Sequence, residues 1–172
     1  PGNSECVLNG TRIMGTIQVA ANAVLTARRI VVIGNVQAEN ARQVNILDNS
    51  RIGGSVQIKQ GGGAIISDSI IESDIQFESN GQPFKVLRND IGGSLQVFQN
   101  SGSVEIQYNT IDGNLQCKEN APAPTGGANR VAGNKEDQCA RLTGLNAAQE
   151  NCIQSHPTFG TDARLHIPRL SV

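Results

Sequence analysis

Short clusters of apolar residues recur along the chain with a period of about twenty residues. In each copy two apolar residues flank a glutamine, and the glutamines stand 19 or 20 positions apart, at Gln18, Gln37, Gln57, Gln76, Gln96 and Gln116. An Ile or Val stands five positions before each glutamine, and a Gly or Ser stands three positions before it. The unit is therefore [IV]-x-G-[NST]-[VIL]-Q-[apolar], interrupted once by Asp74 and followed by a weaker seventh copy at 131–135.

Each copy also carries a second apolar cluster in which apolar and polar residues alternate, as in Val104-Glu105-Ile106. A period of two places successive side chains on opposite faces of a strand. Because the clusters are too short for helices, each copy is expected to hold about three short strands joined by tight turns. The L-x-x-L-x-L signature of leucine-rich repeats is missing, and the uneven apolar spacing does not fit a solenoid with five- or six-residue sub-periods.

A repeat of 19–20 residues built from short strands is typical of one turn of a parallel β-helix. The sequence predicts an all-β, single-stranded, right-handed parallel β-helix of about six coils over residues 1–139, about 29 Å long. The recurring glycine is expected at a corner where the backbone needs a positive φ. Residues 140–172 are predicted to form a capping helix over 141–151 and an extended tail.

Asparagines recur at two further positions of the repeat, where they are expected to bond the amides of the coils above and below. They are Asn22, Asn80, Asn100 and Asn120 at one position, and Asn89, Asn109 and Asn129 at the other. With these columns, residues 6–139 resemble the right-handed parallel β-helix proteins of the pectate-lyase-like superfamily. The segments GNLQCKEN at 113–120, PAPTGG at 122–127 and GNKEDQC at 133–139 are similar to those of a group of uncharacterised bacterial secreted proteins. This resemblance implies an exported β-helix and no known activity.

Composition and charge exclude several classes of partner. Lys plus Arg is 14 and Asp plus Glu is 15, so the net charge of −1 gives no basic arm for a nucleic acid. Aromatic residues are 3% and Trp is absent, which argues against a platform of stacked rings for sugars or bases. No apolar run approaches the roughly 20 residues of a membrane-spanning helix. The chain starts at Pro1 without a leader, as expected of a processed protein or an excised fragment.

The cysteines are Cys6, Cys117, Cys139 and Cys152, and none forms a C-x-x-C pair. With only two histidines beside them, no metal site is predicted. An even number without metal-ligand spacing favours disulfides and an oxidising compartment over four free cytosolic thiols. Cys117 and Cys139 flank a segment rich in Pro and Gly, one coil apart, and are predicted to be bonded. Cys6 and Cys152 could bond within the chain, if the tail folds back, or between two molecules.

Catalytic β-helix proteins that cleave polysaccharides need clustered carboxylates as acid and base. The aspartates here are expected in different columns of the repeat, as isolated turn residues: Asp48, Asp68, Asp74, Asp90, Asp112, Asp137 and Asp162. No catalytic residue is therefore assigned. The glycines at 61–63 are expected in a turn of the solenoid, because no helix follows them as in a phosphate-binding loop, and no cofactor is predicted.

The column of six glutamines is the most regular polar feature, and it is expected to face outward because inward apolar residues flank it. It is either a flat array of amides that binds a repetitive polymer, such as a glycan, or a structural amide ladder, which is favoured. Two positions further on, Glu39, Lys59, Glu78 and Lys118 are expected on the same face and alternate in charge, as in cross-strand pairs.

The sequence therefore favours an exported, non-catalytic structural or adhesive protein, secreted or on the cell surface. Its expected partners are further copies of itself, stacked head to tail, or a polysaccharide. The alternative function is binding or degradation of a polysaccharide by the same β-helix.

Overall fold

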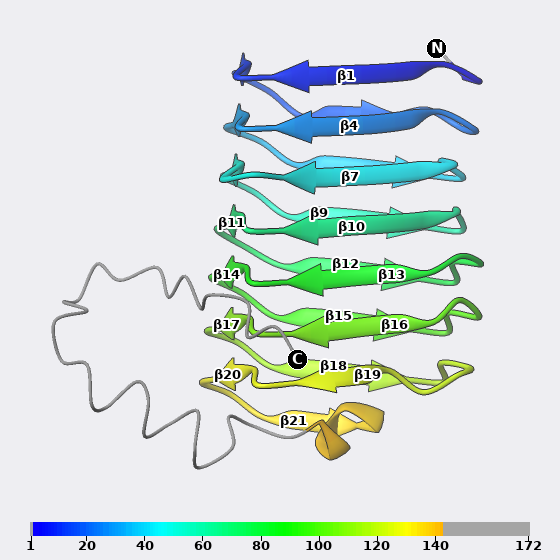
Figure 1. Ribbon diagram of the computed structural model, residues 1–172, viewed down its shortest axis with the longest axis vertical. Helices are drawn as coiled ribbons and strands as arrows, with labels where there is room; N and C mark the ends of the chain where they lie inside the picture. The colour runs from blue at the N-terminus through cyan, green and yellow to red at the C-terminus, as the bar shows by residue number, and fades with distance from the viewer. Residues whose placement is uncertain (1, 143–172) are drawn as a thin grey trace, which may run out of the picture.

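The computed structural model describes residues 2–142 and shows a parallel β-solenoid of seven turns (Figure 1). Three parallel sheets of seven strands each run along the solenoid, and every coil contributes one strand to each sheet. The first sheet, sheet A, contains β1 (Glu5–Asn9), β4 (Val24–Arg28), β7 (Gln43–Leu47), β10 (Gly63–Ser67), β13 (Phe84–Leu87), β16 (Val104–Gln107) and β19 (Thr125–Gly127). The all-β parallel solenoid predicted from the repeat is confirmed.

The other two sheets complete each coil. Sheet B is built from two-residue strands: β2 (Arg12–Ile13), β5 (Val31–Val32), β8 (Arg51–Ile52), β11 (Ile70–Ile71), β14 (Asp90–Ile91), β17 (Thr110–Ile111) and β20 (Arg130–Val131). Sheet C carries the glutamines: β3 (Ile17–Val19), β6 (Val36–Glu39), β9 (Val56–Lys59), β12 (Ile75–Glu78), β15 (Leu95–Phe98), β18 (Leu115–Lys118) and β21 (Lys135–Asp137). The weak copy at 131–135 takes part in β20 and β21, so there is one coil more than the six predicted.

The register follows the repeat because equivalent positions pair between neighbouring coils. Gln57 pairs with Gln37 and Gln76, and Ile71 pairs with Ile52 and Ile91. The predicted inward columns form the core, and most of their members are fully buried. Phe77 of the fourth coil and Phe84 of the fifth pack against each other in the core, with ring centroids 4.5 Å apart. The core is therefore a stack of thin layers, each closed by the coils above and below it.

The predicted asparagine columns are confirmed as buried hydrogen-bonded ladders over Asn80, Asn100 and Asn120 at one corner and over Asn89, Asn109 and Asn129 at the other. Asn22, predicted in the first column, is exposed and lies outside the ladder. Asn100 donates through Nδ2 to Asn120 Oδ1 (2.9 Å) and accepts at Oδ1 from the backbone N–H of Asn80 (3.0 Å). Asn89, Asn109 and Asn129 repeat the pattern at the other corner. No buried side-chain nitrogen or oxygen within residues 2–142 lacks a partner. Buried amides thus close the backbone hydrogen bonds of two corners, where the sheets end.

A third polar column, which follows the recurring glycine, joins the coils at the corner between sheets B and C. The side chains of Thr16, Asn35, Ser55, Asp74, Ser94 and Asn114 each accept the backbone N–H of the equivalent residue one coil later, at 2.7–3.3 Å. Asp74, which interrupts the repeat by residue type, accepts at this place like the others. We call these six residues the corner column. Their arrangement as a ladder was not predicted from the sequence.

The predicted reason for the recurring glycine is wrong. Gly34, Gly54, Gly93 and Gly113 do not have a positive φ; a Cβ at each would instead meet the corner-column side chain of the preceding coil. The left-handed positions are held by other residues, such as Asp68 (φ 52°), Arg88 (φ 56°) and Gln99 (φ 57°). The glycines therefore provide space for a neighbouring side chain, not backbone freedom.

The last described coil ends in a 3-10 turn, Gln138–Arg141 (Figure 1). Gln138 takes the place of a further asparagine, because its Oε1 accepts the Asn120 backbone N–H at 2.9 Å. Of the predicted capping helix over 141–151, residues 143–151 lie outside the described residues, as does the tail. The domain boundary predicted at residue 139 remains a prediction.

Candidate functional site

The glutamines of sheet C form a single amide ladder along the outside of the solenoid. From Gln37 to Gln116 each Nε2 donates to the Oε1 of the next glutamine, at 2.9–3.1 Å, and Gln116 donates to Glu136 Oε2 at 2.7 Å. All five are half-buried, whereas Gln18 is exposed. From Gln57 to Gln116 each amide therefore uses one donor and one acceptor for its neighbours. Glu136, which can only accept, suits the end of the ladder.

The charged column beside the ladder forms fewer pairs than the alternation suggested. Lys59 Nζ lies 2.8 Å from Glu78 Oε2, which confirms one cross-strand pair. Phe98 follows Glu78 in this column, and Lys118 lies nearest to its chain neighbour Glu119, at 3.8 Å. These groups are about half exposed, so each pair contributes at most about 1 kcal/mol.

Two aspartates share one corner, contrary to the prediction that they lie in different columns. Asp48 and Asp68 each follow the end of a strand, β7 and β10, and these strands are neighbours in sheet A. Arg28 Nη1 lies 2.5 Å from Asp48, and Arg88 contacts both oxygens of Asp68, at 2.6 and 2.8 Å. The hydrogen bonds from Arg88 to Asp68 raise the pKa of the guanidinium above its ordinary value. Arginines therefore compensate the charge of both carboxylates.

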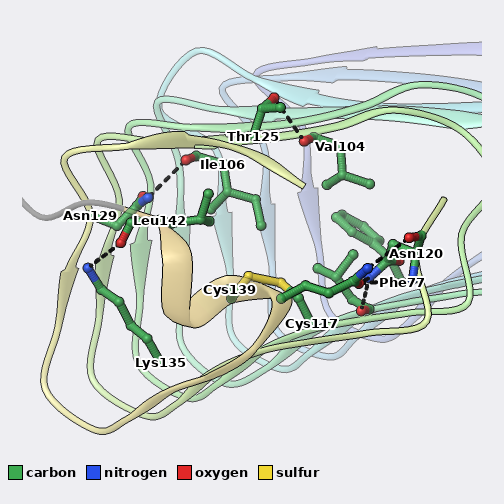
Figure 2. The surroundings of a disulfide bond; sticks show 12 residues. Phe77, Val104, Ile106, Cys117, Asn120, Thr125, Asn129, Lys135, Cys139 and Leu142 are labelled. Carbon is green, nitrogen blue, oxygen red and sulfur yellow. Dashed lines mark hydrogen bonds between the residues drawn. A yellow bond between two sulfur atoms is a disulfide. The ribbon is translucent and has the colours of Figure 1, made fainter. Parts of the chain in front are cut away.

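The predicted disulfide between Cys117 and Cys139 is present, with a Cα–Cα distance of 5.1 Å (Figure 2). Both residues are fully buried, and the bond ties the 3-10 turn to β18 across the end of the core. Leu142 packs beside it, and its carbonyl accepts from Lys135 Nζ at 3.2 Å. Closing a loop with this separation of 22 residues contributes about 3 kcal/mol in the chain-entropy model. Cys6 is an exposed free thiol, and Cys152 lies outside the described residues.

Sequence reasoning missed a hollow on the outside of sheet A, at the corner where sheet C leads into it. Its volume is about 740 Å³, and Gly61 and Gly62, from the run of three consecutive glycines, are among the residues that line it. The other lining residues come from the same turn and strand and from the coils on either side: Asn22, Asn40, Ala41, Arg42, Gln43, Gln60, Ile65, Gln82, Pro83 and Lys85. The sequence signal that could have found the hollow is the run of three glycines at 61–63, because the neighbouring coils carry larger residues at the equivalent positions.

The described residues give two further observations. No group of three or more His, Cys, Asp or Glu side chains within residues 2–142 could hold a metal ion. The same part of the chain contains no helix of the length and hydrophobicity needed to span a membrane.

No family model matches the chain, and the searches of curated proteins and of solved structures found no match either.

Proposed function

We propose that the chain is a non-catalytic structural or adhesive element, secreted or displayed on a cell surface, that acts as a rigid rod. The observation that carries this proposal is the use of its polar side chains. Asparagines, glutamines and the corner column form four ladders that link successive coils. A side chain engaged in such contacts stiffens the rod along its axis. The Cys117–Cys139 disulfide is in accord with an oxidising compartment.

Three finer parts of the interpretation remain predictions. One is membership of the pectate-lyase-like superfamily, together with the right-handed sense. Another is the binding or degradation of a polysaccharide at the glutamine face. The third is head-to-tail stacking, which requires both ends of the rod to be accessible; among the described residues, the 3-10 turn crosses one end.

Single-molecule force spectroscopy tests the mechanical role. The chain is pulled through handles attached at its first and last described coils, without reductant. We expect coil-by-coil unfolding, at a force that falls in the double variant Gln57→Ala/Gln96→Ala, because the amide ladder is then broken at two places. Gln107→Ala is the matched control, since Gln107 is half-buried on sheet A, outside the ladder.

The same preparation is incubated with a panel of polysaccharides, and new reducing ends and unsaturated products are measured. We expect neither product. Turnover of any polymer would contradict the non-catalytic role. Equal unfolding forces for the double variant and the wild type would contradict the mechanical role of the ladder.

A further inference from the structure

The hollow over residues 61–63 has a simple structural origin. Gly61, Gly62 and Gly63 pass between two coils that carry Arg42 and Gln43 on one side and Gln82 and Pro83 on the other. A Cβ on Gly62 would overlap the Arg42 carbonyl oxygen, and one on Gly61 would lie 2.7 Å from the Ala41 carbonyl oxygen. The glycines are therefore required for coil stacking. Because the glycines have no side chains, a trench remains between the backbones of the two flanking coils. These backbones are two strand spacings, or about 10 Å, apart.

The side chains around this trench are polar and positively charged. Five of its lining residues carry amides, Asn22, Asn40, Gln43, Gln60 and Gln82. Arg42 and Lys85 are cationic, and no Asp or Glu lines the hollow. Because Lys85 is paired with Glu105, Arg42 supplies the uncompensated positive charge of the hollow.

Arg42 differs from the basic residues that the solenoid uses for its own stability. Arg28, Arg51 and Arg88 each pair with a carboxylate one coil away, and Lys85 lies 3.1 Å from Glu105. Within residues 2–142, no carboxylate lies within ion-pair distance of the exposed Arg42 guanidinium. Its donors are thus available to a ligand.

We propose that this trench binds an anionic oligosaccharide. A guanidinium presents a planar fork that matches a carboxylate or sulfate group. The surrounding amides both donate and accept, as sugar hydroxyls require. Ile65 and Pro83 add a small apolar surface for the C–H face of a sugar ring. The site is distinct from the glutamine ladder, which lies on sheet C, and it is independent of the mechanical role, because a rod can be stiff with or without a ligand here.

Isothermal titration calorimetry on the full chain tests the site with three probes of equal length: a mannuronate hexamer, a sulfated galactan hexamer and neutral cellohexaose. We expect an anionic hexamer to bind and cellohexaose not to bind; the anionic probe that binds identifies carboxylate or sulfate as the group recognised. Arg42→Gln should weaken this binding by about tenfold, since a charge-assisted contact is lost.

Arg12→Gln is the matched control, because it removes the same charge from an exposed arginine on sheet B, outside the trench. It should leave the affinity unchanged. Equal weakening by both variants, equal binding of the neutral hexamer, or no binding of either anionic hexamer would overturn the proposal. Circular dichroism of each variant confirms that the fold is intact. The force measurement reports on the ladder alone, so failure of one proposal is distinguishable from failure of the other.

Discussion

At the residue scale, a buried asparagine side chain bonds several groups of different coils at once. Asn100 is 1% exposed, and its Nδ2 donates to the carbonyls of Phe77 (3.3 Å) and Phe98 (3.0 Å) as well as to Asn120. Its Oδ1 accepts two bonds from Asn80. One amide therefore satisfies backbone groups of its own coil and of neighbouring coils, in a place that water does not reach.

Asn100→Ala should lower the free energy of unfolding by about 3 kcal/mol, because it leaves several buried donors and acceptors without partners. Gln96→Ala should cost no more than about 1 kcal/mol, since that amide is half-buried and water replaces its bonds. Urea unfolding followed by circular dichroism, without reductant, measures both. Equal losses would show that burial of the asparagine ladder does not determine its contribution.

The asparagine ladders were predictable from sequence because a 20-residue recurrence equals one coil, which places equivalent residues directly above one another. The corner column was not predicted, although the same recurrence holds Thr16, Asn35 and Ser55. Its residue types vary, and its partner is a backbone N–H, which has no signature in the sequence. Asp74 differs from the Asn, Ser and Thr of this column in residue type, so it interrupts the sequence pattern. Its carboxylate nevertheless accepts a hydrogen bond as their side chains do.

At the element scale, the corner between sheets B and C depends on close packing of one coil against the next. The Oδ1 of Asn35 lies where a Cβ of Gly54 would be, and it accepts the Ser55 N–H at 2.8 Å. In the fourth coil Ser73 replaces the glycine, and the bond there, from Asp74 N–H to Ser55 Oγ, is one of the longest of the set at 3.3 Å. Glycine thus leaves the space that the Asn35 side chain occupies at this corner.

Gly54→Ala should destabilise the chain by about 2 kcal/mol, because the new methyl group displaces Asn35 from its hydrogen bond. Gly15→Ala is the matched control, since Gly15 occupies the same repeat position and a Cβ added there would meet no atom within 4 Å. Thermal unfolding of this control should show little change, or a small gain from the stiffer unfolded chain.

A double-mutant cycle distinguishes overlap of the new methyl group with Asn35 from a cost that alanine would have at this corner whatever its neighbour. In the background Asn35→Ala, the further cost of Gly54→Ala should fall by more than half. An unchanged cost would mean that Asn35 is not the group displaced, and that the nearby Gly34 carbonyl oxygen, 3.0 Å from the Cβ position, determines the effect.

The strands themselves were predictable because alternation of apolar and polar residues places one face inside. The predicted positive φ at the glycines failed, since sequence alone cannot distinguish a glycine needed for backbone conformation from one needed for space. The trench at 61–63 was missed for a related reason: three glycines indicate a turn, whereas the hollow exists only because Arg42 and Gln82 come from the coils on either side.

At the scale of the whole molecule, the solenoid is close to one-dimensional, since the paired strands of each sheet belong to successive coils. In such proteins stability is approximately a sum over coils and the interfaces between them. A coil that is removed in full should therefore shorten the rod without changing the rest of it.

Deletion of residues 77–96 tests this, because it removes 20 residues and joins Gln76 to Val97, which normally pairs with Phe77. Both members of the Phe77–Phe84 pair leave together, so no half-filled layer remains. We expect a folded protein whose maximum dimension in small-angle X-ray scattering is about 5 Å shorter. Deletion of residues 77–86 is the control: it removes half a coil and places outward residues in inward columns, so it should abolish the β-sheet signal in circular dichroism. If both deletion variants are unfolded, the stability of the rod is not a sum of independent coil contributions, and it depends instead on cooperation between distant coils.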